Sequence, residues 1–283
     1  MIKSNELEIE KETMSTMVEL TSAFEGIASA RIAQIREQVL QSQEYFGDLW
    51  RIYSQLRVDE FFHFGRGDKD VEAIEKELMI LITSEGSFSG DIDQKLVNEA
   101  LKHYNPAKNA ILIIGHHGAV QLAQKGVAYV RSFKTPEKDM NINTGPIVAE
   151  VQKYRSTMIY YEQYKSLTSQ NTQSMRLSKA VMERGHAVAA GEEVIDESTY
   201  IFEPDAYAVV DHLERSMMEI TISEVILESK LAQYASRFRA MSAAKERATD
   251  TLDDVSLMFN RAKRHEKDER LKEVVNGLRK AAA

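Results

Sequence analysis

The sequence of 283 residues contains no cysteine. This absence excludes disulfides, thiolate zinc sites and cysteine nucleophiles, and it suits a reducing compartment, so we expect a cytoplasmic protein. Long apolar runs are missing as well: no window approaches the roughly 18 residues of a membrane span, and the first 12 residues lack the apolar core of a signal peptide. We therefore expect membrane association through partners and no direct insertion.

Charge of one sign is not in large excess. Lys and Arg number 36 against 44 Asp and Glu, a formal net charge of −8, and the two signs are interspersed. A broad basic surface for nucleic acid is therefore not expected. The hydrophobic content of 43% is sufficient for a packed core.

Proline and glycine are scarce at both ends of the chain. The four prolines fall between residues 106 and 204, residues 1–60 hold two glycines, and residues 205–283 hold one. Long helices are therefore predicted at the ends and a different structure in the middle.

Apolar residues at the two ends recur at steps of three and four, the spacing of a coiled-coil seam. Pro204 precedes the second helix, and Asp205 is positioned to cap it. We predict an antiparallel coiled coil of helices 1–62 and 205–283, the second on the order of 100 Å long at helical rise. The seam residues are Met14, Met17, Thr21, Phe24, Ala28, Ile32, Ile35, Val39, Phe46, Leu49, Tyr53 and Leu56, and Leu231, Tyr234, Phe238, Met241, Ala244, Ala248, Leu252, Val255, Phe259 and Ala262.

The middle of the chain alternates predicted strands and helices. A strand at 77–85, a helix at 91–104, a strand at 109–118 and a helix at 119–126 follow in β-α-β-α order. Further strands are predicted at 156–167 and 172–181. This order favours a Rossmann-like α/β domain at 75–200 with a mainly parallel sheet.

Motifs for catalysis or cofactor binding are weak in this domain. Residues 83–91 lie where doubly wound folds bind phosphate but match neither glycine-rich nucleotide motif, and Ser89 is outside the nucleophile-elbow frame. His116 and His117 adjoin at a predicted strand end, where neighbouring side chains point to opposite faces, which favours a polar loop over a metal site. We expect no catalytic residue, cofactor site or metal site; the role of the two histidines stays open.

Small residues line both predicted helices. Ala240, Ala243, Ala244 and Ala248 lie on one, and the stretch "EGIASARI" at 25–32 lies on the other. A coiled coil of two helices with such small side chains is a thin rod, which can fit a narrow opening in another protein. An ordinary coiled coil with alanine in its seam is the alternative.

The C-terminal block resembles the gamma subunit of F-type ATP synthases, the rotor of the central stalk. Residues 200–205, "LTSAFEGIASARI" and "ITSEGSFSGD" are similar to other blocks of that family, so the resemblance spans nearly the whole chain. The matching C-terminal residues are Arg237, Ala240, Met241, Ala243, Ala244, Ala248, Asp253, Asp254, Leu257, Asn260, Arg261 and Ala262.

Three departures mark a divergent member. The first turns are acidic where the family is basic, Gly86 stands where a basic residue is usual, and residues 24–26 replace methionines and a polar residue. In an antiparallel coil the acidic start lies beside basic residues near 261–264. We therefore expect carboxylates of residues 1–12 to pair with Arg261, Lys263 or Arg264.

The resemblance implies a non-catalytic subunit that couples ion-driven rotation to ATP synthesis or hydrolysis. It implies that the helices stand inside a hexamer of alpha and beta subunits, with the globular domain beside the epsilon subunit and the membrane c-ring at the inner face of the cell membrane. No cofactor is implied. The residues expected to contact the surrounding ring of subunits are Arg31, Glu228, Arg237, Met241, Asn260 and Arg261.

The sequence is also compatible with other functions. A gamma-like shaft of a related ATPase, coupled to something other than an ion ring, has the same sequence pattern. A coiled-coil scaffold with an α/β module accounts for the seams but not for the family block. A small-molecule enzyme needs a phosphate or metal motif in the central domain.

Overall fold

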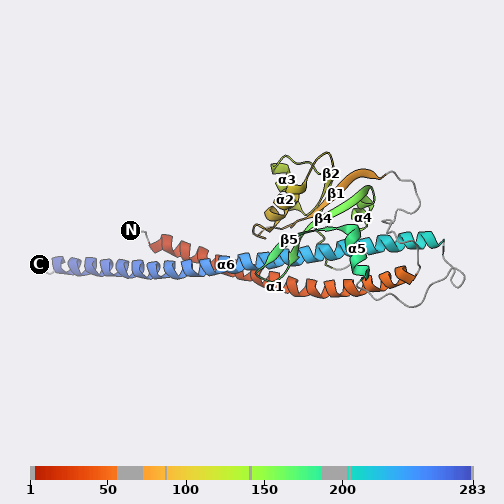
Figure 1. Ribbon diagram of the computed structural model, residues 1–283. Helices are drawn as coiled ribbons and strands as arrows, with labels where there is room; N and C mark the ends of the chain where they lie inside the picture. The colour runs from red at the N-terminus through yellow and green to blue at the C-terminus, as the bar shows by residue number, and fades with distance from the viewer. Residues whose placement is uncertain are drawn as a thin grey trace. The chain divides into compact units, whose positions relative to one another are not determined.

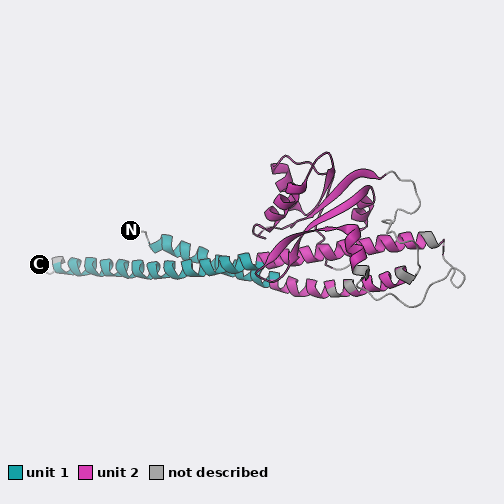
Figure 2. Cartoon of the chain, viewed as in Figure 1, with its two compact units in different colours: residues 1–28, 238–283 teal, residues 29–237 magenta. Residues whose placement is uncertain are grey.

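The computed structural model describes residues 4–55, 73–86, 88–139, 142–186, 203 and 205–281. The chain divides into two compact units, coloured separately in Figure 2: unit 1 comprises residues 1–28 and 238–283, and unit 2 comprises residues 29–237. The elements, labelled in Figure 1, are α1 (Ser4–Gln55), β1 (Ile74–Ile82), α2 (Ile92–His103), β2 (Asn109–Ile114), α3 (His116–Gln124), β3 (Arg131–Phe133), α4 (Gly145–Val151), β4 (Tyr154–Tyr164), β5 (Gln170–Arg176), α5 (Leu177–His186) and α6 (Ala206–Ala281).

The two long helices predicted at the ends of the chain are confirmed. Helix α1 has 52 residues and α6 has 76. The backbone N–H of Ala208 donates a hydrogen bond of 2.7 Å to Oδ1 of Asp205, which is the N-terminal cap expected from the sequence. Among the described residues, no helix combines the length and the hydrophobicity that a membrane crossing requires.

Unit 1 is an antiparallel helix pair. Ser4 on α1 lies beside Glu266 on α6, Leu7 packs with Phe259, and Glu25 lies beside Lys245. The residue numbers of the partners on α6 therefore decrease as those on α1 increase. The antiparallel arrangement predicted from the two seams is therefore confirmed.

Small and apolar side chains close the seam of unit 1. Ala28 and Ala248 are buried, as are Val255 and Phe259, whereas Phe24 is 38% exposed although its spacing places it in the predicted seam. Alanine at buried positions lets two helix backbones approach closely, which is how this pair stays thin.

Unit 2 contains a five-stranded sheet of order β3-β2-β1-β4-β5. The pairs β1·β2, β1·β4 and β2·β3 are parallel, and β4·β5 is antiparallel. This mainly parallel sheet confirms the predicted fold class. The parallel pairing is possible because α2, α3 and α4 form crossovers. Each crossover returns the chain to the end of the sheet at which the previous strand began.

The two faces of the sheet pack against different helices. Alternation along β1 sends Leu78 and Ile80 to one face and Met79 and Leu81 to the other. The first face packs against α4, α5 and the unit 2 portions of α1 and α6, and the second packs against α2 and α3 (Figure 1). The long helices therefore supply one wall of the unit 2 core.

Two predicted boundaries are wrong. The strand expected at 172–181 ends at Arg176, and α5 begins at Leu177, because Leu177, Ala180 and Val181 are buried at helical spacing. The strand expected at 109–118 ends at Ile114, so His116 and His117 form the first turn of α3 rather than a loop crest.

Glycine explains the sharp turn before α3. Gly115 has φ of +102°, and a Cβ there would lie 2.1 Å from the carbonyl oxygen of Thr83. Only glycine tolerates both this backbone conformation and this close approach. The backbone can therefore leave β2 and enter α3 within one residue.

Candidate functional site

The predicted contact residues of unit 1 differ in exposure. Asn260 and Arg261 are exposed on α6, whereas Met241 is only 7% exposed. The Met241 side chain is therefore used for packing within this chain and offers little surface to a partner. Asn260 and Arg261 adjoin Phe259, whose ring belongs to the buried cluster with Leu7 and Val255.

The outer faces of the unit 1 helices carry large apolar side chains. Leu271 is 68% exposed and Ile9 is 66% exposed. Isolated exposed apolar residues are normal on proteins, but a repeated series along a helix makes that surface a candidate for contact with another protein. The series comprises Ile9, Met17, Leu20, Phe24 and Ile27 on α1, and Leu257, Met258, Leu271, Val274, Val275 and Leu278 on α6.

In unit 2, the predicted residues Arg31 and Arg237 come together. Both line a pocket of about 470 Å³ that also contains Glu85, Lys230 and Tyr234. Glu228 is half-buried on α6 and does not line this pocket. No signal in the sequence indicated that these two predicted contact residues are neighbours.

Arg237 is held in place by its surroundings. Its guanidinium lies 5.1 Å from the ring centroid of Tyr234, and Nη2 donates to Oγ of Ser89 at 3.4 Å. A Cβ at Gly86 would lie 3.2 Å from the same Nη2. The glycine that departs from the family pattern therefore leaves the space that the Arg237 side chain uses.

An ion cluster around the buried Asp139 joins three segments of unit 2. Lys230 on α6 donates hydrogen bonds to Oδ1 of Asp139 and, at 2.7 Å, to the carbonyl oxygen of Pro136. Arg31 on α1 lies 3.4 Å from Oδ2 of the same aspartate. Lys230 is 4% exposed and Asp139 is 5% exposed. No sequence motif marks Asp139, so this cluster was not predicted.

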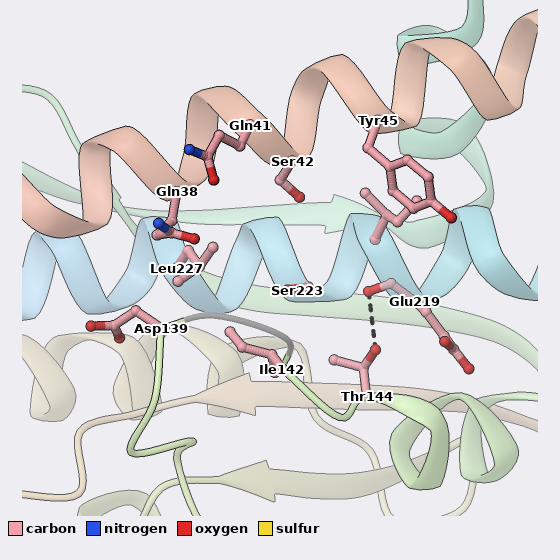
Figure 3. Close-up of a pocket in the computed structure, with 11 residues that line it drawn as sticks. Gln38, Gln41, Ser42, Tyr45, Asp139, Ile142, Thr144, Glu219, Ser223 and Leu227 are labelled. Atoms are coloured by element: carbon pink, nitrogen blue, oxygen red, sulfur yellow. Dashed lines mark hydrogen bonds between the residues drawn. The ribbon is translucent and has the colours of Figure 1, made fainter.

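A second pocket, of about 410 Å³, has Asp139 in its lining (Figure 3). The hydroxyl of Thr144 donates to the carbonyl oxygen of Glu219 at 3.1 Å at its edge. Its lining is polar apart from three aliphatic side chains. The residues are Gln38, Gln41, Ser42 and Tyr45 from α1, Asp139, Ile142 and Thr144 from the segment before α4, and Glu219, Ile220, Ser223 and Leu227 from α6.

The carboxyl ends of β1 and β2 carry a polar cluster. Oδ1 of Asp93 accepts from the backbone N–H of Ser84 at 2.9 Å, and Oδ2 accepts from the Ser84 hydroxyl. Nδ1 of His117 lies 3.1 Å from both Oδ2 of Asp93 and Oγ of Ser84. A nucleophilic serine needs a base that is itself oriented by the acid, whereas here one nitrogen of His117 meets both groups. The arrangement ties the first turns of α2 and α3 to β1.

Glu162 on β4 lies close to this cluster. Burial raises the pKa of Glu162 to about 7; the hydrogen bond that Oε1 accepts from the Thr172 hydroxyl at 2.7 Å opposes the shift, and the charge of Asp93 adds to it. Across the described ranges, no three His, Asp or Glu side chains are arranged to hold a metal ion.

Comparison with known proteins accounts for this combination of a helix pair and a parallel sheet. A family model described as ATP synthase matches residues 4–280. The ATP synthase gamma chain of Chlorobaculum parvum is 25% identical over 277 residues, which cover 92% of each chain. The chain belongs to the ATP synthase gamma family.

Solved structures share the fold of this gamma-family chain. A chain from the Euglena gracilis mitochondrial ATP synthase, OSCP/F1/c-ring in rotational state 3, aligns with a TM-score of 0.64 at 15% identity over 97% of this chain and 94% of that one. A chain of the rotor of the same synthase in rotational state 1 gives 0.59 at 15% identity over 92% and 98%. The role of the gamma subunit, in the central stalk, follows from the family.

Proposed function

We propose that this chain is the rotating shaft of an F-type ATP synthase and hydrolyses nothing itself. It carries torque between a membrane c-ring and a catalytic hexamer of alpha and beta subunits, with the epsilon subunit beside the α/β domain. It works in the cytoplasm at the inner face of the cell membrane. The observation that carries the proposal is the series of exposed apolar residues on the unit 1 helices, because such a surface favours a partner that removes it from water.

Coupling follows from the asymmetry of the helix pair. At any instant the three beta subunits meet three different faces of the shaft, so each is biased toward a different conformation and nucleotide affinity. Rotation exchanges these biases in order. Torque is therefore a coupling free energy between rotation angle and nucleotide affinity.

The proposed contacts with the hexamer are polar residues that supplement the apolar surface. They are Asn260 and Arg261 on unit 1, and Arg31, Glu228 and Arg237 on unit 2. Met241, the sixth predicted contact residue, has a buried side chain and is therefore proposed to act through the packing of α6.

The test is purification of the native complex through a tag on this chain, followed by ATP-driven ion pumping in vesicles. We expect alpha, beta, epsilon and ring subunits to copurify, and Arg261→Ala to lower pumping per ATP hydrolysed. Arg155→Ala is the matched control, because Arg155 is exposed on β4 and pairs with Glu75.

Two results contradict the proposal. Isolation of the chain without a hexamer supports a coiled-coil scaffold instead. Isolation with a hexamer but without a ring, and with ATP hydrolysis that drives no ion movement, supports a related ATPase motor with another output.

A further inference from the structure

Helix α6 contacts the α/β fold of unit 2 in two different ways. Between residues 217 and 226 most of its buried side chains are apolar and belong to the core beneath the sheet, and Thr221 and Glu224 are buried beside them. Between residues 229 and 237 its contacts include a set of hydrogen bonds to the last residue of β1 and to the segments that follow β1 and β3. We call the second set, Ser229, Lys230, Ser236 and Arg237, the docking strip.

The docking strip binds backbone as well as side chains. The hydroxyl of Ser229 donates to the carbonyl oxygen of Ile82 at 3.4 Å, and that of Ser236 donates to the carbonyl oxygen of Ser89 at 2.8 Å. Lys230 donates to the carbonyl oxygen of Pro136 and to Asp139. All four acceptors lie just beyond the carboxyl ends of β1 and β3, or at the last residue of β1.

The two kinds of contact respond differently to twisting of the helix. Apolar burial is non-directional, so a small rotation of α6 that keeps the area buried changes the hydrophobic contribution little. Hydrogen bonds weaken steeply when their angles change, and a buried ammonium that loses its carboxylate is left uncompensated. Rotation about the helix axis is therefore resisted mainly where the docking strip lies.

Lys230 is the most constrained member of the strip. Its ammonium and the Asp139 carboxylate are both nearly inaccessible to solvent, and Arg31 of α1 holds the second carboxylate oxygen. One aspartate thus connects α6, α1 and the segment after β3. A twist of either helix has to move this group.

We propose that Lys230, through its buried ion pair with Asp139, is a positioning residue that fixes the angular position of α6 against the α/β fold and so transmits torque between them. This inference rests on the proposed function as a rotor. It assigns the stiffness of the contact between α6 and the α/β fold to the polar docking strip and not to the apolar core beneath the sheet.

Because the chain has no cysteine, the stiffness of the contact between α6 and the α/β fold can be measured with a probe on one introduced cysteine. A single Leu167→Cys, placed at a side chain that is 42% exposed between β4 and β5, gives one attachment point for a probe on the α/β fold. The complex is held on a surface through the hexamer in a nucleotide-locked state. The spread of probe angles then reports the compliance between α6 and the fold.

With Lys230→Met we expect a wider spread of probe angles and a loss of ion pumping per ATP hydrolysed. Lys102→Met is the control, because Lys102 pairs with Glu99 at the surface of α2 and should change neither value. If Lys230→Met gives the same spread as the parent, the inference is wrong.

A second variant separates stiffness from stability. Lys230→Met combined with Asp139→Leu replaces the ion pair by apolar side chains, which restores thermal stability in many buried pairs. We expect its melting temperature to recover while the wide spread of angles persists; recovery of both would overturn the proposal, and this variant can be read even where Lys230→Met alone fails to fold. If the probe on the parent complex shows no ATP-driven rotation, the proposed function fails instead.

Discussion

Lys245 on α6 donates a hydrogen bond of 3.0 Å from Nζ to Oε2 of Glu25 on α1. Glu25 occupies a position at which the chain departs from the family pattern, and its partner lies in the alanine-rich block of α6. The pair joins α1 and α6 within unit 1. The hydrogen bond from Lys245 holds the pKa of Glu25 below its usual value.

Loss of this pair should have a small and pH-dependent effect. Because both side chains retain contact with water, we expect Lys245→Met to lower the free energy of unfolding by about 0–1 kcal/mol at pH 7. A lowered carboxyl pKa contributes stability above the unfolded pKa and loses it as the pH falls through the folded pKa. Urea unfolding should therefore show a larger difference from the parent at pH 7 than at pH 3, and Lys267→Met, an exposed change on the same helix, should show none at either pH.

Glu162 should make stability fall as the pH rises. Its pKa is raised from 4.5 to about 7, so between these values the folded state keeps a proton that the unfolded state releases. The stabilisation is complete below pH 4.5 and is lost through pH 7, by about 2–4 kcal/mol in total. We expect Glu162→Gln to remove this slope and to be more stable than the parent at pH 8.

Urea unfolding between pH 4.5 and pH 8 measures this dependence. Glu75→Gln is the control, because the Glu75 side chain is 80% exposed on β1. A parent slope that persists in Glu162→Gln would show that another group is responsible.

Enlarging a buried alanine should disrupt unit 1. Ala28 is fully buried, so Ala28→Leu should cost about 1–3 kcal/mol through overpacking, and it should impair copurification with the hexamer. Ala23 is exposed on the same helix, and alanine and leucine have similar helix propensities, so Ala23→Leu should be close to neutral. Thermal unfolding of the two variants checks the contrast; equal melting temperatures would mean that the seam does not require small residues.

The start of α1 should depend on Phe259 and not on ion pairs. Within residues 4–55 and 205–281, no carboxylate of residues 4–12 lies within ion-pair distance of Arg261, Lys263 or Arg264, so the pairing expected from the sequence is not formed. Instead Leu7 packs on Phe259, and the ammonium groups of Lys11 and Lys263 lie 5.6 and 5.0 Å from its ring centroid.

We therefore expect Phe259→Ala to increase amide hydrogen exchange across residues 4–14, because it removes an apolar contact and two cation–π contacts worth about 0.5–1 kcal/mol each. Reversal of Glu8 and Glu12 to Lys should leave exchange in this segment unchanged, since both carboxylates are exposed. A larger effect of the charge reversal than of Phe259→Ala would restore the electrostatic explanation.

The sequence by itself determined the long helices, their antiparallel pairing, the mainly parallel sheet and the family. Each of these follows from periodic or local signals in the sequence. The signals are seam residues at steps of three and four, few prolines and glycines at the chain ends, and short apolar strands that alternate with helices. Asp205 is a local signal of the same kind, because a capping carboxylate acts on an N–H only three residues away.

Only the tertiary structure decided which polar residues meet. Asp139 and Lys230 lie 91 positions apart, and Ser84 and His117 lie 33 apart, and no local signal in the sequence links the members of either pair. Their contacts exist because parallel strands bring the segments after β1, β2 and β3 to one edge of the sheet, against α6. The exposure of the seam side chains could not be predicted from the sequence either. Met241 and Phe24 have equivalent seam spacing, yet Met241 is buried and Phe24 is exposed. Burial depends on the facing helix as well as on the helix that carries the residue.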